Sequence, residues 1–142
     1  MILSPKTVKI LLVYPLGHFD TFRYIPEEYT QSLLNQYMLS FSERVLKIAL
    51  SIPPGRVTTY GRIARAAGGG PMASQSITSI LGKAWDKGEK NIPWHRIVYA
   101  DGRIWVDEKH RSERMKLYQK EGIVIDTNGR VANFHDLLFE LK

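Results

Sequence analysis

The chain contains no cysteine. Disulfides, thiolate metal sites and thiol nucleophiles are therefore excluded. The chain also lacks an apolar run long enough to cross a membrane, because the run at residues 10–13 stops at Tyr14. Lys6 and Lys9 precede that run as in a signal peptide, but the run is short and no small-residue cleavage site follows it. We expect a soluble, cytoplasmic protein.

Acidic side chains are outnumbered in this sequence. Its 142 residues include 20 Lys and Arg but 14 Asp and Glu, which gives a net charge of +6. Residues 1–41 carry three side chains of each sign, so the whole excess lies after Phe41. Such an excess favours an anionic partner, with nucleic acid as the first choice, while a solvated basic surface is the alternative.

The chain is long enough for one core and a small extension, since 44% of its residues are hydrophobic. Residues 1–38 have evenly spaced prolines and no clear period before Glu27. We interpret them as an N-terminal arm of unknown role, with a short strand at residues 8–13 and a helix from about Glu27. The patterned remainder, residues 39–142, is expected to form the single domain.

The first well-patterned helix is expected to begin at Ser42 as its N-cap and to end before Pro53. Its repeating apolar residues predict a buried helix face. That face consists of Val45, Leu46, Ile48, Ala49 and Ile52.

Two shorter helices follow. Thr59 is expected to cap a helix over residues 60–67, and after the glycine-rich break at residues 68–71 Ser74 or Ser76 opens another that reaches Trp85. Two short helices joined by a glycine-rich turn predict a helix-turn-helix.

The last third of the chain predicts a small β-hairpin and further helices. Residues 97–99 and 104–106 flank an Asp101-Gly102 turn and form the expected hairpin. A charged amphipathic helix should begin at Asp107 or Ser112 and end at Gly122. A turn at Asn128-Gly129 and a final helix at residues 134–141 complete a mainly helical fold.

Residues 93–98, Pro-Trp-His-Arg-Ile-Val, resemble the active-site signature Pro-Cys-His-Arg-Val of the O6-alkylguanine-DNA alkyltransferases. Earlier in the chain, residues 52–61 match that family's Ile-Pro-x-Gly-x-Val-x-x-Tyr-Gly pattern, and Ile63-Ala64 follow. Downstream, Asp101-Gly102 and the helix end at residues 120–122 also fit. The resemblance covers residues 40–125 and implies a winged-helix-like DNA-binding domain of the alkyltransferase C-terminal type.

Trp94 stands where the family has its cysteine. Alkyl transfer from the guanine oxygen needs a polarizable thiolate, which an indole lacks. Proteins with tryptophan at this position are alkyltransferase-like, and that resemblance implies a non-catalytic sensor that flips O6-alkylguanine into a pocket and passes it to nucleotide-excision repair. Trp94 then walls the pocket, unless it merely fills the core. The other implied lesion-pocket residues are Trp85, Ile97, Ile104 and Trp105.

His95 and Glu121 match the family pair in which a histidine activates the cysteine and a carboxylate orients the imidazole. With Trp94 in place of the nucleophile, this pair has nothing to deprotonate, so we expect a structural hydrogen bond between the two residues. Arg96 is expected to pair with acidic side chains or carbonyls. The alternative is an enzyme with altered chemistry, in which His95 and Glu121 act as acid and base on a flipped base.

Tyr60 matches the family tyrosine that presses on the phosphate 3′ to the target and helps to rotate the nucleotide, although it could simply pack its helix on the core. The family arginine that fills the vacated base stack is replaced by Ser79 or, in a shifted register, Ser76. Serine is too short for that task, so either another side chain such as Gln75 fills the gap or flipping is less well supported. Further expected DNA contacts are Thr59, Ser74, Ser76, Ser79 and Lys83.

The expected partner is double-stranded DNA carrying alkylated guanine, followed by nucleotide-excision repair proteins and no membrane. We expect a monomer without cofactor or metal, at the nucleoid of a prokaryote or in the nucleus of a eukaryote. The main alternative is a helix-turn-helix DNA-binding or regulatory protein on the same scaffold that does not flip bases. The missing arginine favours that alternative.

Overall fold

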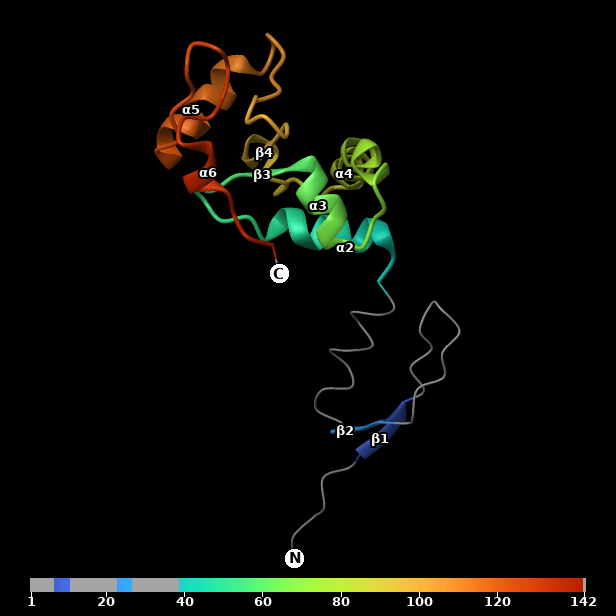
Figure 1. Ribbon diagram of the computed structural model, residues 1–142. Coiled ribbons are helices and arrows are strands. Elements are labelled where there is room, and N and C mark those ends of the chain that lie inside the picture. The colour runs from blue at the N-terminus through green and yellow to red at the C-terminus, as the bar shows by residue number, and fades with distance from the viewer. Residues whose placement is uncertain (1–6, 11–22, 27–38, 142) are drawn as a thin grey trace, which may run out of the picture. The chain divides into compact units, whose positions relative to one another are not determined.

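The computed structural model describes residues 7–10, 23–26 and 39–141. The chain divides into two compact units, Met1–Leu39 and Ser40–Lys142 (Figure 1). Within the described residues, no helix is long and apolar enough to cross a membrane.

The first unit contains a two-stranded antiparallel sheet. Strand β1 (Thr7–Ile10) pairs with β2 (Arg23–Pro26), and Thr7 lies opposite Pro26. β1 overlaps the strand predicted at residues 8–13. The helix predicted from Glu27 lies outside the described residues.

Helix α2 (Phe41–Leu50) opens the second unit with a capping box. Ser40 Oγ accepts a hydrogen bond from Glu43 N at 3.2 Å, and Glu43 Oε2 accepts one from Ser40 N at 2.7 Å. These reciprocal bonds satisfy backbone N–H groups that the helix itself cannot pair. The N-cap predicted at Ser42 is therefore wrong, because Ser42 has Val45 three residues later and cannot form such a pair.

The predicted helix-turn-helix is present. Its helices are α3 (Tyr60–Ala66) and α4 (Ile77–Asp86), and the 3₁₀ turn η1 (Ala73–Ser76) leads into α4. Thr59 is confirmed as the cap of α3, since its Oγ1 accepts a hydrogen bond from Arg62 N at 3.2 Å. The chain between the two helices brings the start of α4 back onto α3.

That close return depends on Gly69. A Cβ at this position would lie 2.5 Å from the Ala73 Cβ and 2.9 Å from the Phe41 ring. Neither distance is possible for a real side chain, so any larger residue would push η1 away from α2 and α3.

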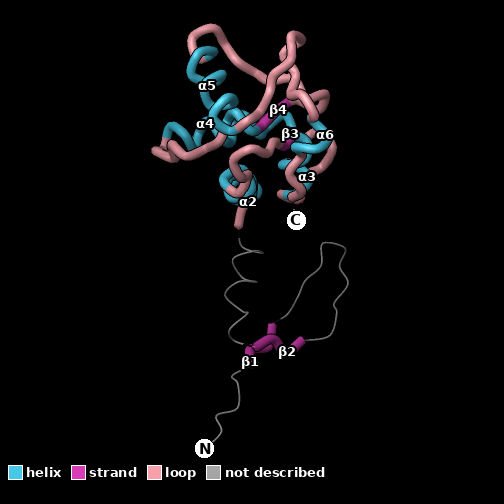
Figure 2. Tube along the Cα trace, turned by 90° about the vertical axis from the view of Figure 1, so that its left-hand side faces the viewer, coloured by secondary structure: helices cyan, strands magenta, loops and turns pink. Residues whose placement is uncertain are grey.

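A short parallel sheet joins the start of α3 to the second half of the unit. β3 (Thr58–Thr59) pairs with β4 (Ile97–Val98), which follows the 3₁₀ turn η2 (Trp94–Arg96). In Figures 1 and 2 these strands lie in the middle of the unit, between the helices. The sheet therefore fixes η2 relative to the first helix of the helix-turn-helix.

The predicted hairpin of residues 97–99 with 104–106 is replaced by this arrangement. The Asp101-Gly102 turn forms, with Tyr99 N donating to Arg103 O at 2.9 Å. Beyond the turn the chain leaves β4, because Ile104 N donates to Gly129 O at 3.0 Å and residue 103 pairs with residue 130. The partner of β4 comes instead from a segment some forty positions earlier.

Helix α5 (Arg111–Glu121) ends as predicted at Gly122, which has φ +72°. It begins at neither Asp107 nor Ser112. Asp107 Oδ1 instead accepts a hydrogen bond from His110 N at 2.9 Å, which organises the turn before the helix.

Helix α6 (Phe134–Leu137) is shorter than the predicted helix at residues 134–141. Val57 N donates to Leu137 O at 3.0 Å, and Phe139 N donates to Val57 O at 2.8 Å. These bonds draw the chain after α6 into an extended path beside Val57, where its backbone groups are paired.

The core of this unit has two clusters of buried residues. The larger cluster joins α2, α3, α4 and β4, and the smaller one lies under α5 and the segments that follow it. The smaller cluster consists of Val57, Val98, Tyr118, Ile123 and Val131. The mainly helical fold class expected from the sequence is confirmed.

Candidate functional site

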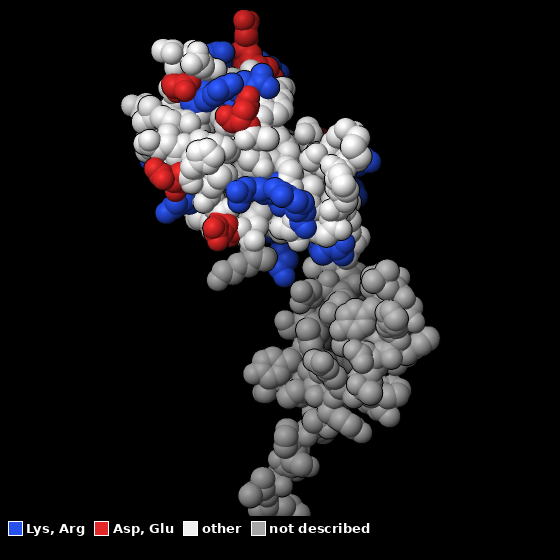
Figure 3. Space-filling view, in the orientation of Figure 1, with Lys and Arg blue, Asp and Glu red and all other residues white. Residues whose placement is uncertain are grey.

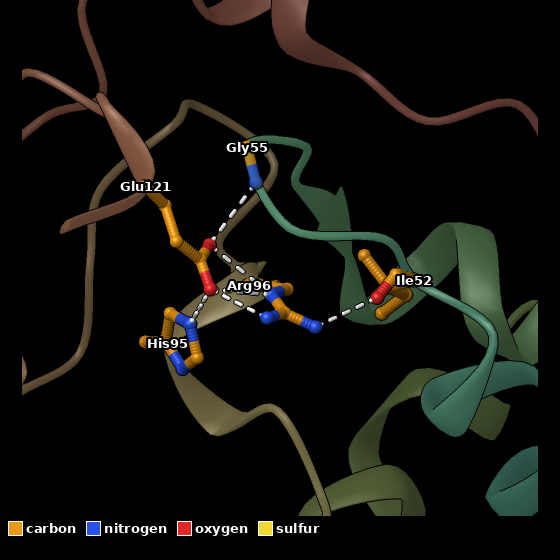
Figure 4. A network of polar contacts seen from close by, with 5 residues as sticks. All are labelled: Ile52, Gly55, His95, Arg96 and Glu121. Carbon is orange, nitrogen blue, oxygen red and sulfur yellow. Dashed lines mark hydrogen bonds and ion pairs between the residues drawn. The ribbon is translucent and has the colours of Figure 1, made fainter. Parts of the chain in front are cut away.

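Glu121, the last residue of α5, contacts two side chains of η2 and a backbone N–H of the loop before β3 (Figure 4). Its Oε1 lies 2.8 Å from His95 Nε2, and its Oε2 accepts a hydrogen bond from Gly55 N at 3.1 Å. Arg96 donates Nε and Nη2 to the same carboxylate and Nη1 to Ile52 O at 2.9 Å. The predicted His95–Glu121 hydrogen bond is present, and Arg96 pairs with both a carboxylate and a carbonyl. We call these residues the Glu121 network.

The charges of this network follow from its contacts. Burial alone would raise the pKa of Glu121, but the hydrogen bonds from Arg96, His95 and Gly55 outweigh it and lower the pKa to about 2. Burial lowers the pKa of His95, and the hydrogen bond to Glu121 offsets this only in part. At neutral pH Glu121 is therefore ionised and His95 neutral. The His95 proton is assigned to Nε2, because an ionised carboxylate can only accept.

The Glu121 network holds together the loop before β3, the turn η2 and the end of α5. The Glu121 side chain is 8% exposed and that of Arg96 17% exposed. Removing either partner would leave the other charge largely buried without compensation. The arrangement suits a structural clamp that fixes the position of η2.

A hollow of about 780 Å³ opens beside η2 and α4, and all three tryptophans of the chain line it. Trp85 comes from α4, Trp94 from η2 and Trp105 from the loop after β4. We call it the tryptophan hollow. Its ionisable lining residues are Asp86, Lys90, His95, Arg96, Asp107, His110, Glu113 and Arg114.

An adjoining hollow of about 560 Å³ is lined by Tyr60 and Tyr99, whose ring centres lie 5.8 Å apart. We call it the tyrosine hollow. It shares Thr78, Trp94 and Trp105 with the tryptophan hollow. Trp94 and Trp105 thus border both hollows.

The predicted lesion-pocket residues differ in where they lie. Trp85, Trp94 and Trp105 all line the tryptophan hollow, whereas Ile97 is 2% exposed within the larger core cluster and Ile104 packs on the smaller one. Successive residues of an extended segment point to opposite sides. Ile104 therefore points inward where its neighbour Trp105 points toward the hollows.

The predicted DNA-contacting residues differ in how available they are. Thr59 is 6% exposed and its Oγ1 already caps α3, so little of its side chain reaches the surface, and its DNA contact stays a prediction. Ser76 donates its Oγ to Ala73 O at 2.8 Å. Both hydroxyls thus form hydrogen bonds with backbone groups of their own segment.

The remaining predicted contacts lie at the surface of the helix-turn-helix. Tyr60 and Ser74 are half-buried and line the tyrosine hollow. Ser79 and Lys83 are exposed one helical turn apart on α4. These four residues remain predicted DNA contacts.

Some lining residues were not anticipated. Lys90 Nζ lies 4.5 Å from the Trp85 ring centre and donates to Trp85 O at 2.9 Å. It follows the end of α4, where no sequence period applies. Thr78 could have been found, because its spacing to Gly82 and Trp85 puts all three on one side of a helix.

Basic and acidic side chains are interspersed around α5 on the face of the molecule shown in Figure 3. The positive charge on this face is therefore not one continuous basic stripe. On the helix-turn-helix, Lys83 is an exposed basic residue one helical turn from Ser79 on α4.

The sequence matches the family model for the DNA-binding domain of 6-O-methylguanine DNA methyltransferase over residues 40–123. The chain belongs to this methyltransferase family. Within it, the chain is 34% identical over 92 residues to the DNA base-flipping protein of Escherichia coli K12, covering 65% of this chain and 69% of that protein. It is 32% identical over 95 residues to Alkyltransferase-like protein 1 of Schizosaccharomyces pombe, covering 62% of this chain and 81% of the relative.

Solved structures of this methyltransferase family show the same fold. The S. pombe protein Atl1 in complex with damaged DNA containing O6-carboxymethylguanine matches with a TM-score of 0.57 at 24% identity, over 70% of this chain and 94% of Atl1. A second structure of that protein with DNA matches with a TM-score of 0.55 at 26% identity, over the same shares. The family and the fold predicted from the sequence are confirmed.

Proposed function

We propose that this protein is a non-catalytic sensor that binds O6-alkylguanine in DNA by flipping the nucleotide. The observation that carries the proposal is the position of Trp94 between two hollows, beside a helix-turn-helix, in a chain without cysteine. A thiolate acceptor is absent, whereas flat aromatic walls suited to an extruded base are present.

The relatives support binding to damaged DNA. The E. coli relative is named for DNA base flipping, and the S. pombe relative was solved with DNA that contains O6-carboxymethylguanine. This chain shares the helix-turn-helix fold and offers Tyr60 at the start of α3, next to the tyrosine hollow. Extruding a base costs a few kcal/mol of stacking, and contacts to the rotated backbone and the base can offset it.

A sensor of this kind leaves the lesion chemically unchanged. Repair then requires a second activity, and we propose nucleotide-excision repair proteins as that activity. The protein would act as a monomer wherever the chromosomal DNA lies, in the cytoplasm of a prokaryote or the nucleus of a eukaryote.

A second candidate is a helix-turn-helix DNA-binding or regulatory protein that does not flip bases. The observation that favours it is Ser79, a short exposed side chain on α4 at the position where the family arginine is expected. Such a protein would grip phosphates through Ser74, Ser79 and Lys83 without distinguishing a damaged base.

Equilibrium binding to matched duplexes separates these candidates. Fluorescence anisotropy would compare a duplex carrying one O6-methylguanine with the same duplex carrying guanine, at one fixed salt concentration because phosphate contacts are salt-dependent. The sensor proposal expects the damaged duplex to bind about tenfold more tightly or better, equivalent to ~1.4 kcal/mol. Equal affinities would support the second candidate.

A further inference from the structure

The exposed side of α4 carries no flat side chain that could enter a base stack. Ser79 has a short side chain, and the Ser76 hydroxyl before the helix donates a hydrogen bond to Ala73 O. Lys83 is long, but its ammonium group is compact and strongly hydrated. A base rotated out of a duplex leaves a gap whose neighbours lose stacking, and flipping proteins fill such gaps with long or flat side chains. The filler must come from another element.

We propose that Trp105 fills the gap left by the extruded base. This inference rests on the proposed flipping function and names the residue that supports the flipped state. Trp105 is 51% exposed, whereas Trp85 and Trp94 are half-buried against the larger core cluster. An indole left in water forgoes the hydrophobic stabilisation that burial would give it, and stacking between bases would recover it.

The loop that carries Trp105 is anchored on both sides. Ile104 N donates to Gly129 O at 3.0 Å before it, and after it Asp107 Oδ1 accepts hydrogen bonds from His110 N and Nδ1 at 2.9 and 2.7 Å. Arg114 Nη1 also donates to Trp105 O at 3.3 Å. A loop held this way presents its side chain without a large ordering cost on binding.

Trp105 also lies where the tyrosine hollow and the tryptophan hollow adjoin. It lines both hollows, and in the tyrosine hollow its neighbours include Tyr60 and Ser74, two predicted phosphate contacts. The tryptophan hollow, which it also lines, is the larger of the two spaces. A side chain between the backbone contacts and the base pocket lies where the vacated stack would be.

Other exposed candidates fit less well. Met72 is 68% exposed but lines neither hollow. Tyr99 is 39% exposed, but the Arg103 guanidinium lies 5.1 Å from its ring centre and Tyr60 packs at its side. Gln75 is exposed and lines the tyrosine hollow, and it is the principal rival.

A duplex with a tetrahydrofuran abasic site tests the proposal, because it contains the gap but no base to flip. Wild-type protein should bind this duplex more tightly than the intact duplex. Trp105→Ala should bind both the abasic and the O6-methylguanine duplexes about tenfold more weakly than wild type, and Trp105→Phe should keep most of the affinity. Adding Ser79→Arg to Trp105→Ala should restore part of the loss, because it places a long planar cation on α4.

Three results would overturn the proposal. They are no preference of wild type for the abasic duplex, a Trp105→Ala loss confined to the O6-methylguanine duplex, and a loss on the abasic duplex in Gln75→Ala but not in Trp105→Ala. The confined loss would make Trp105 a pocket wall instead. Met72→Ala is the matched control for removing an exposed apolar side chain and should bind as wild type. A wild-type protein that fills abasic gaps but does not prefer O6-methylguanine would instead refute the proposed function.

Discussion

The Glu121 network and the tryptophan hollow meet in the same three-residue turn, η2, yet they are built differently. In the network, Glu121 is almost enclosed and accepts hydrogen bonds from His95, Arg96 and Gly55. In the hollow, half-exposed indoles such as Trp94 face open space. His95 and Arg96 of the network also line the hollow, so η2 belongs to both regions: hydrogen bonds to Glu121 fix where η2 lies, and Trp94 gives it an aromatic side chain facing the hollow.

The largest expected effect is on the network. Glu121→Gln keeps the size of the side chain but removes the charge that compensates Arg96, so the free energy of unfolding should fall by about 3 kcal/mol. Urea denaturation measures this. Asp101→Asn is the matched control, since Asp101 pairs with Arg103 at the surface and should matter far less. Similar effects for the two variants would mean that the network is not a clamp.

The next largest effect is expected on DNA binding, from substitutions in the tryptophan hollow. Trp94→Ala should weaken binding to O6-methylguanine duplex by roughly tenfold or more, since aromatic–base stacking contributes about 1–3 kcal/mol. Trp94→Phe should retain much of the affinity. Glu121→Gln, assayed at a temperature where it is folded, should keep its preference for the damaged duplex. If Glu121→Gln lost as much preference for the damaged duplex as Trp94→Ala, the Glu121 network and the tryptophan hollow would not have different roles.

A smaller effect is expected at the edge of the tyrosine hollow. Tyr60→Ala should reduce the preference for O6-methylguanine over guanine by about three- to tenfold, because a half-buried ring beside the rotated backbone is lost. Anisotropy at fixed salt measures the ratio of the two affinities. An unchanged ratio would assign Tyr60 to helix packing alone.

The smallest effect concerns His95 and mild acid. Its pKa is lowered in the folded protein, chiefly by burial, so the unfolded chain binds a proton first as the pH falls below about 6.5. The stability due to neutral His95 is therefore complete above that pH and is lost progressively below it. The pKa of Glu121 is about 2 in the folded protein, so the stability that Glu121 contributes is lost only as the pH falls below the ordinary glutamate pKa of 4.5. Urea denaturation from pH 7.5 to 5 should show a modest decline that His95→Gln lacks.

Local signals in the sequence predicted much of the fold. The cap at Thr59 and the end of α5 at Gly122 depend on neighbouring residues, and both were correct. The N-cap at Ser42 was wrong because Ser40 has Glu43 at the right spacing and competes successfully. The pairing of β3 with β4 and the extended path after α6 depend on segments far apart in the chain, which no local period reveals.

The site was predictable only in part for a similar reason. The family resemblance implied one pocket for Trp85, Trp94 and Trp105, and all three line one hollow, because the resemblance carries long-range information that the residues alone do not. It also implied Ile97 and Ile104 for that pocket, and these two lie with the core clusters, because the direction of a side chain on an extended segment depends on register. Lys90 over Trp85 had no sequence signal at all.

The most direct test of the account follows the fate of the lesion. Wild-type protein would be incubated with one equivalent of O6-methylguanine duplex under conditions where anisotropy shows the complex, and protein and DNA would then be separated and weighed by intact mass spectrometry. A sensor without transfer activity should show lesion-dependent binding with full recovery of O6-methylguanine and an unchanged protein mass. Loss of the methyl group from the DNA, or its appearance on the protein, would contradict recognition without transfer.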